Sequence, residues 1–106
     1  MRLKKSLGQN FLRSNAVAKK LVDSGDIMTN DVVVEVGPGK GIITNFLLQK
    51  AGHVIAIEKD GRMIEYLKEK FSQEISSQKL TLVYGDILKF YPNDYELAPS
   101  AYIVVG

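Results

Sequence analysis

Two kinds of hydrophobic periodicity alternate along the chain. Nearly every position is apolar over 32–36 (VVVEV) and 53–57 (HVIAI), and two further segments rich in apolar residues cover 79–84 and 101–105. Segments of this length that are rich in β-branched residues are typical of strands buried on both faces of a parallel sheet. The pattern therefore predicts four strands.

Between these runs, apolar residues recur at intervals of three and four, as on one face of an amphipathic helix. Ser14 is a candidate N-cap for a helix over about 15–24, and Gly25 would end it. Asp60 is a candidate N-cap for a later helix. The predicted apolar stripes comprise Val17, Leu21 and Val22 in the first helix, Ile43, Phe46, Leu47 and Ala51 in the second, and Ile64, Leu67 and Phe71 in the third.

Strands that alternate with helices over units of this length predict an α/β fold with a parallel sheet and right-handed crossovers. Residues 1–13 precede the first predicted helix and are expected to form a loop, as are residues 91–100. In an open sheet of this kind, ligands bind beyond the carboxyl ends of the strands. Functional residues are therefore expected at those ends.

Composition limits the class of protein. The chain has 106 residues, of which 45% are hydrophobic, and this fits one small domain or a piece of a larger one. It has no cysteine and a single histidine, His53, so neither a disulfide framework nor a metal cluster is expected. No apolar run approaches the roughly 18 residues of a membrane helix. We expect a soluble protein of the cytoplasm that binds no metal.

Charge is distributed unevenly along the chain. The first twenty residues hold six basic residues and no acidic one, so the rest carries a net charge of −4, given +2 for the whole chain. The six are Arg2, Lys4, Lys5, Arg13, Lys19 and Lys20. A basic arm can be a solvated tail, an organelle-targeting segment or a contact surface for nucleic-acid phosphates, and charge alone leaves these possibilities open.

A glycine-rich segment, VEVGPGKG over 34–41, directly follows the first predicted strand. A glycine turn between a strand and a helix lets backbone amides and the helix dipole approach a ligand closely. The dinucleotide fingerprint needs a third glycine where this chain has Ile42, so the segment departs from the NAD pattern. With Glu35 two residues before Gly37, it instead resembles the first motif of the S-adenosylmethionine-dependent methyltransferases.

Acidic residues mark the ends of the predicted strands. Glu58 lies 21 residues after Gly37, where a carboxylate can accept hydrogen bonds from both hydroxyls of a ribose. Asp86 follows the third strand, where it can accept from the amino group of adenine. Glu35 suits the ammonium at the methionine end of the cofactor. A buried strand carboxylate, a surface acid and a turn aspartate are the structural alternatives for Glu35, Glu58 and Asp86, respectively.

The arm makes the prediction specific. Residues 5–12, KSLGQNFL, followed at this distance by VEVGPGKG, resemble the rRNA adenine N6-dimethyltransferases over essentially the whole chain. The resemblance implies a Rossmann-like methyltransferase fold with S-adenosylmethionine as cofactor. In that family, the residue matching Asn10 and the backbone matching Leu12 contact the cofactor. The implied cofactor-binding residues are Gln9, Asn10, Leu12, Glu35, Gly37, Gly39, Glu58, Asp86 and Ile87.

The resemblance also implies a domain organisation. Residues 1–13 form the basic arm, and 14–106 form the N-terminal part of the Rossmann-like domain, truncated after its fourth parallel strand. The family places its catalytic element, Asn, Leu or Ile, Pro and an aromatic residue, directly after that strand, so it is expected just after Gly106. We therefore assign no catalytic residue within the chain, and we expect it to bind cofactor without transferring a methyl group.

Several functions remain open for the parent protein. The resemblance implies an enzyme that dimethylates two adjacent adenines near the 3′ end of small-subunit rRNA, and we expect it to be a monomer. The charge of the arm suits the phosphates of such a substrate, so Lys4, Lys5 and Arg13 are expected to contact the RNA. The alternatives are an enzyme of the branch that methylates large-subunit rRNA and confers antibiotic resistance, or a non-catalytic nucleotide- or RNA-binding relative. An NAD-dependent dehydrogenase is a weaker possibility, because of Ile42 and the Gln9-Asn10 arm.

Overall fold

The computed structural model describes residues 2–4, 23, 27–89 and 102–105, and the statements below concern these residues. The predicted helix over about 15–24 and the predicted loop over 91–100 fall outside this description, apart from Asp23, which is helical.

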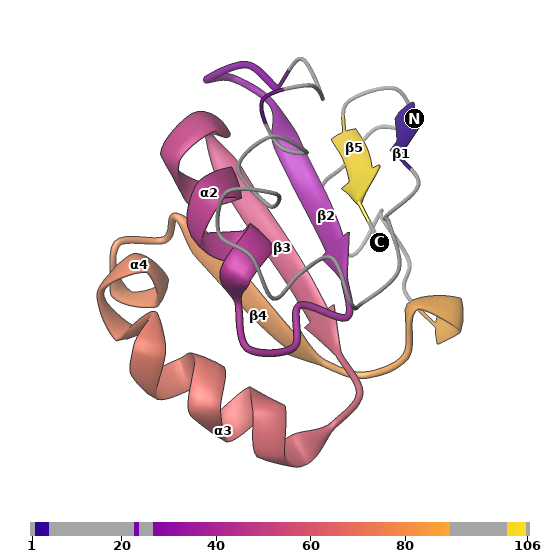
Figure 1. Cartoon of the computed structure of the whole chain (residues 1–106), viewed down its shortest axis with the longest axis vertical. Coiled ribbons are helices and arrows are strands. Elements are labelled where there is room, and N and C mark those ends of the chain that lie inside the picture. Colours follow the sequence, from indigo (N-terminus) through magenta and orange to yellow (C-terminus); the bar gives the residue numbers. More distant parts are fainter. Residues whose placement is uncertain (1, 5–22, 24–26, 90–101, 106) are drawn as a thin grey trace.

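Five parallel strands form one sheet in the order β1-β5-β2-β3-β4 (Figure 1). The bounds of the strands are Arg2–Lys4 for β1, Val32–Val36 for β2, His53–Glu58 for β3, Leu80–Tyr84 for β4 and Tyr102–Val105 for β5. The prediction of an α/β fold with a parallel sheet is thus confirmed.

The order of the strands places a topological switch beside β2. From β2 the chain continues outward through β3 and β4, and it then returns to pair β5 with the opposite side of β2. A crevice opens at such a switch because the connections on its two sides leave in opposite directions. The glycine segment follows β2 directly, so it lies at this point of the sheet.

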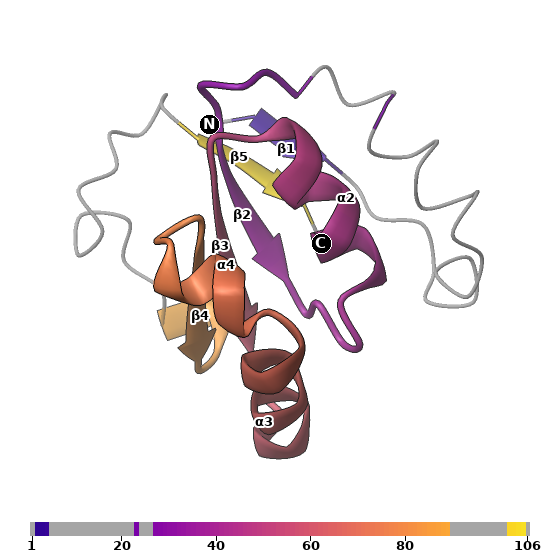
Figure 2. The same ribbon diagram turned by 90° about the vertical axis from the view of Figure 1, so that its left-hand side faces the viewer.

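Helices cover one face of the sheet. They are α2 (Ile42–Lys50), α3 (Gly61–Lys70) and α4 (Ser72–Ser76), followed after β4 by the short 3-10 helix η2 (Ile87–Lys89). Figure 2 shows that α3 begins at the end of the sheet toward which the arrowhead of β2 points. This is the carboxyl edge, where ligands of open α/β sheets bind.

The core lies between this face and the helices. Leu47 of α2 and Leu67 of α3 are fully buried against Val33, Val54 and their neighbours. Burying a leucine side chain contributes about 2 kcal/mol. The predicted stripes of α2 and α3 therefore face the sheet, and Asp60 caps α3 as predicted by accepting a hydrogen bond from the Arg62 amide (2.9 Å).

Two elements differ from the prediction. Arg2–Lys4 is a strand, so the prediction of a loop throughout the arm is wrong at these three residues. They pair in parallel with Ile103–Val105, which gives the backbone of β5 a partner on its outer side. The sequence gives no indication of the strand β1, because a single leucine between basic residues carries no strand pattern. The short helix α4 was also not predicted.

Candidate cofactor-binding site

The glycine segment forms a tight loop between β2 and α2. Gly37, Gly39 and Gly41 all adopt positive φ angles, of 67°, 57° and 85°. Residues with a Cβ atom are strained in this conformation. The loop is closed by hydrogen bonds from the Gly37 amide to the Ile57 carbonyl and from the Gly41 amide to the Pro38 carbonyl, both 2.9 Å.

The three glycines meet different surroundings. A Cβ atom on Gly37 or Gly39 would meet no protein atom within 4 Å, whereas one on Gly41 would lie 2.5 Å from the Phe71 ring. Gly37 and Gly39 therefore leave open space beside the backbone, into which a ligand fits. Gly41 is needed for packing between the loop and α3.

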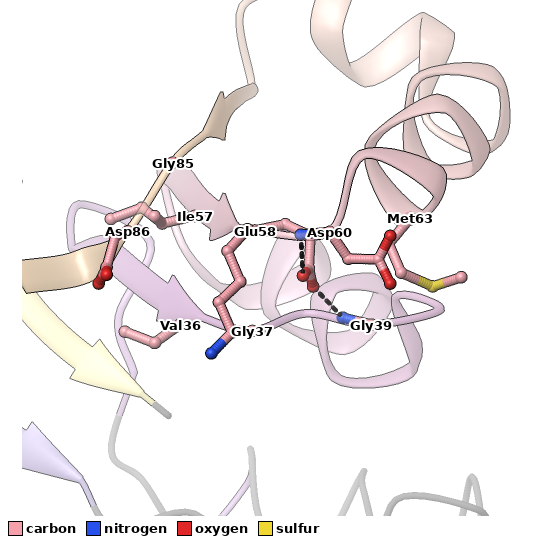
Figure 3. Close-up of a pocket in the computed structure, with 10 residues that line it drawn as sticks. Val36, Gly37, Gly39, Ile57, Glu58, Asp60, Met63, Gly85 and Asp86 are labelled. Carbon is pink, nitrogen blue, oxygen red and sulfur yellow. Dashed lines mark hydrogen bonds between the residues drawn. The ribbon is translucent and has the colours of Figure 1, made fainter.

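Glu58 ends β3 and lies beneath the loop. Its side chain is buried, at 7% exposure. One carboxylate oxygen accepts a hydrogen bond from the Gly39 amide (3.1 Å) and the other from the Asp60 amide (2.9 Å), as Figure 3 shows. Each carboxylate oxygen has two lone pairs, so each retains one for a further donor. Glu58 is thus fixed in place and still able to accept hydrogen bonds from a ligand.

Asp86 follows β4 on the same edge of the sheet. The Gly85 amide donates to the Glu58 carbonyl (2.9 Å), which ties this turn to the end of β3. The Asp86 side chain is exposed, and one of its carboxylate oxygens accepts from the Leu88 amide (2.9 Å) at the start of η2. Asp86 therefore stabilises the turn, which is the structural alternative named for it in the sequence. Its second carboxylate oxygen is available to a ligand. Ile87 begins η2, and its side chain lies outside the description.

A cavity of about 330 Å³ joins these features. This volume lies at the lower end of the range for small-molecule sites. Figure 3 shows Glu58 between the glycine loop and the start of α3, with Asp86 on the other side of the cavity. The lining residues are Val36, Gly37, Gly39, Ile57, Glu58, Lys59, Asp60, Met63, Gly85 and Asp86. Acceptors at two strand ends and open glycine backbone fit an adenosine with a polar tail.

Glu35 is not among the residues that line the cavity. It is buried in β2, at 3% exposure, and accepts a hydrogen bond from the Thr44 hydroxyl of α2. Burial raises the pKa of the Glu35 carboxyl to about 7, since the lowering by the Thr44 hydrogen bond is smaller and the Glu58 charge raises the pKa further. A contact between Glu35 and the cofactor's ammonium stays a prediction.

The raised pKa of Glu35 predicts a pH-dependent stability. Between pH 4.5 and about 7 the folded chain keeps the Glu35 proton that the unfolded chain has released. The free energy of unfolding therefore falls as pH rises through this window, by at most about 3 kcal/mol. In Glu35→Gln, which cannot ionise, we expect urea unfolding between pH 5 and 8 to lose this part of the slope.

Glu65→Gln is the matched control, because the Glu65 side chain is 76% exposed on α3. It should keep the pH slope of the parent chain. If Glu35→Gln and the parent chain show equal slopes, the Glu35 carboxyl does not carry the proton.

The remaining predicted residues are placed as follows. Gln9, Asn10, Leu12, Lys5 and Arg13 lie outside the described residues, and Lys4 is described only through its backbone in β1. As expected, His53 lies at the start of β3, where it shares a hydrogen bond with the Thr81 hydroxyl (2.8 Å).

Sequence reasoning missed part of the cavity wall. Ile57, Lys59 and Met63 line it beside Glu58. Ile57 and Lys59 flank Glu58 in the sequence, so their place beside the cavity could have been predicted from that of Glu58. Met63 comes from the first turn of α3 and carried none, because its place depends on how α3 leaves the sheet.

Within the described residues, no group of three or more His, Cys, Asp or Glu side chains is arranged to hold a metal ion. No helix in this part of the chain combines the length and the apolar character that a membrane span requires.

Solved structures with a similar arrangement include methyltransferases. The 23S rRNA methyltransferase ErmE is similar with a TM-score of 0.75 and 28% identity, over 91% of this chain and 36% of ErmE. A dimethyladenosine transferase from Plasmodium falciparum is similar with a TM-score of 0.69 and 28% identity, over 88% of this chain and 32% of that protein. The sheet, the glycine loop and these neighbours define a Rossmann-like S-adenosylmethionine-dependent methyltransferase domain.

Sequence comparison gives the family. The family model described as ribosomal RNA adenine dimethylase matches residues 1–105. The ribosomal RNA small subunit methyltransferase A of Dehalococcoides mccartyi is 42% identical over 89% of this chain and 31% of its own length. That of Lactiplantibacillus plantarum is 44% identical over 84% of this chain and 29% of its own length. The chain belongs to the ribosomal RNA adenine dimethylase family, and it spans about a third of the length of these relatives.

Proposed function

We propose that this chain is the cofactor-binding part of an enzyme that transfers methyl groups from S-adenosylmethionine to the N6 atom of adenines in ribosomal RNA. The observation that carries the proposal is the cavity at the carboxyl edge, where the glycine loop, Glu58 and Asp86 meet. Membership of the adenine dimethylase family supports the reaction and the class of substrate.

Each part of the cavity has a proposed role toward the cofactor. Glu58 accepts hydrogen bonds from the ribose hydroxyls through the lone pairs that Gly39 and Asp60 leave free. The free oxygen of Asp86 accepts from the adenine amino group. The open backbone at Gly37 and Gly39 holds the methionine portion, and Glu35 is the proposed hydrogen-bond acceptor for its ammonium group. When bound, S-adenosylmethionine supplies the methyl group.

Further contacts to the cofactor are proposed from the family resemblance. They comprise Gln9, Asn10 and Leu12 of the arm and Ile87 of η2. The chain residues thereby bind and orient the cofactor at the edge of the sheet.

The proposed target is a pair of adjacent adenines near the 3′ end of small-subunit rRNA, methylated by a monomeric enzyme in the cytoplasm. Relatives named small subunit methyltransferase A, at 40–44% identity, support the small subunit. A second candidate is methylation of large-subunit rRNA, and the likeness to the 23S rRNA methyltransferase ErmE supports it.

Radiolabelled S-adenosylmethionine offered with each purified ribosomal subunit to the full-length protein separates the two candidates. Label in dimethyladenosine of the small-subunit rRNA is the expected result. Label in the large subunit would replace the first candidate by the second, and label in neither would overturn both.

The basic arm is proposed to contact rRNA through Lys4, Lys5 and Arg13. We expect Lys4→Glu combined with Lys5→Glu to weaken RNA binding by the full-length protein about tenfold and to flatten its salt dependence, because fewer counterions are released. Cofactor affinity should stay nearly unchanged. Filter binding at several salt concentrations measures the effect.

Lys68→Glu with Lys79→Glu makes the same change of charge at two exposed positions outside the arm. This control should bind RNA more tightly than the arm variant. An arm variant that lost cofactor affinity as strongly as RNA affinity would instead indicate a structural role for the arm.

A further inference from the structure

The outer side of the glycine loop is held by the last turn of α3. The Lys70 ammonium donates a hydrogen bond to the Lys40 carbonyl (2.8 Å), 30 residues earlier in the chain. Lys40 lies between the two glycines whose φ angles are 57° and 85°. The hydrogen bond therefore reaches the loop between Gly39, which faces the cavity, and Gly41, which packs against α3.

The position of this ammonium is fixed by two aromatic rings. The Lys70 nitrogen lies 5.6 Å from the centroid of the Tyr66 ring and 5.4 Å from that of the Phe71 ring. Both distances are in the range of cation–π attraction. A lysine in the last turn of a helix is also favoured by the helix dipole. Lys70 is thus aimed at the loop by the helix that carries it.

The Lys40 carbonyl is well suited to such a donor. The hydrogen bonds of α2 start one residue later, where the Gly41 oxygen accepts from the Asn45 amide (3.0 Å). The Lys40 carbonyl lies just before the first of these bonds, and the donor that it meets is the Lys70 ammonium. A charged donor gives a stronger hydrogen bond than a neutral one.

Packing supports the same contact. The Phe71 ring and the Leu67 side chain lie against Gly41 so closely that a Cβ atom there would approach them to 2.5 Å and 3.1 Å. On the opposite side, the Gly39 amide donates to Glu58. The loop is held between the end of β3 on the cavity side and the end of α3 on the outer side.

We propose that Lys70 is a positioning residue, which holds the glycine loop from α3 in the conformation that presents Gly37 and Gly39 to the cofactor. It does not line the cavity, so it acts through the Lys40 carbonyl and not by contact with the ligand. The inference rests on the proposed function, since it assigns the loop to cofactor binding.

The test compares three variants by calorimetric titration with S-adenosylmethionine. Lys70→Met keeps the aliphatic stem and removes the donor, so we expect a dissociation constant about fivefold higher. Lys70→Arg restores a charged donor and should recover most of the affinity. Lys68→Met is the control, because Lys68 is exposed on the same helix and pairs with Glu65 (3.6 Å). It should bind as the parent chain does.

Two readouts separate positioning from general destabilisation. The thermal midpoint of Lys70→Met should stay within about 2 °C of the parent value, since the side chain is exposed. In the full-length enzyme, KM for the cofactor should rise while kcat is kept. Equal affinity of Lys70→Met and the parent chain, or an equal loss in Lys68→Met, would overturn the proposal.

Hydrogen exchange of the Gly41 amide, measured by NMR without ligand, tests the contact independently of the cofactor. This amide closes the loop onto the Pro38 carbonyl, and its exchange should be faster in Lys70→Met than in the parent chain. Unchanged exchange would refute the positioning role. Faster exchange in a chain that binds no S-adenosylmethionine would leave the contact standing and reject the proposed function.

Discussion

Glu58→Ala is expected to weaken binding of S-adenosylmethionine about 100-fold or more. The change removes the acceptor proposed for both ribose hydroxyls, and a hydrogen bond to a charged group contributes about 1.5–3 kcal/mol. It also releases the Gly39 and Asp60 amides, which the carboxylate holds at 3.1 Å and 2.9 Å. The ligand contact and the geometry of the loop are therefore lost together. Calorimetric titration measures the effect.

Glu58→Gln separates these two contributions. Its amide has nearly the same shape but only one oxygen, so it keeps one acceptor and loses the charge. We expect an affinity between those of the alanine variant and the parent chain. Glu69→Ala, an equivalent truncation at an exposed position of α3, should bind normally. Undiminished binding by Glu58→Ala would place the ribose elsewhere and contradict the site.

Gly41→Ala is expected to lower the free energy of unfolding by about 4 kcal/mol. A φ angle of 85° is unfavourable for alanine, at roughly 1–2 kcal/mol. The added Cβ atom would lie 2.5 Å and 2.9 Å from two atoms of the Phe71 ring, which is itself buried in the core. Overpacking of this kind costs about 1–3 kcal/mol more. Urea unfolding monitored by circular dichroism measures the loss.

Gly39→Ala is the matched control for this prediction. Its φ angle of 57° carries a similar strain, but no protein atom lies within 4 Å of the added Cβ atom. We therefore expect a loss of only about 1–2 kcal/mol in stability, together with weaker cofactor binding, because the methyl group enters the space proposed for the ligand. Equal destabilisation by the two substitutions would show that Phe71 does not press against the loop at Gly41.

Local patterns predicted the glycine loop and the two acidic residues at the carboxyl edge of the sheet. β2 has the predicted bounds, 32–36, and Glu58 and Asp86 lie at the strand ends to which their spacing assigned them. These features follow from periodicity and from the rule that parallel strands bring their carboxyl ends to one edge. They need no knowledge of contacts between distant residues.

Contacts between distant parts of the chain could not be predicted in this way. The sequence indicated that Gly41 belongs to a ligand loop, but its tightest constraint is the ring of Phe71, 30 residues later. The hydrogen bond between Lys70 and Lys40 and the pairing of β1 with β5 are of the same kind. Each depends on how helices and strands pack in three dimensions.

The hydrogen-bond partner of Glu35 could not be predicted from the sequence either. The position of Glu35 before the glycines suggested a direct role toward the cofactor, and its burial in a strand was foreseen as the alternative. Its hydrogen-bond partner, the Thr44 hydroxyl, belongs to the next helix, nine residues later. A strand pattern predicts that a carboxylate is buried, but which side chain meets it depends on how α2 packs on β2.

The cavity at the carboxyl edge is proposed to bind S-adenosylmethionine. The most direct test is a calorimetric titration of the chain with S-adenosylmethionine and, separately, with NAD, using Asp86→Ala as the control variant. We expect saturable binding of S-adenosylmethionine, weakened in Asp86→Ala, and no binding of NAD. Binding of NAD with equal or higher affinity, or binding of S-adenosylmethionine that Asp86→Ala leaves unchanged, would contradict the proposal.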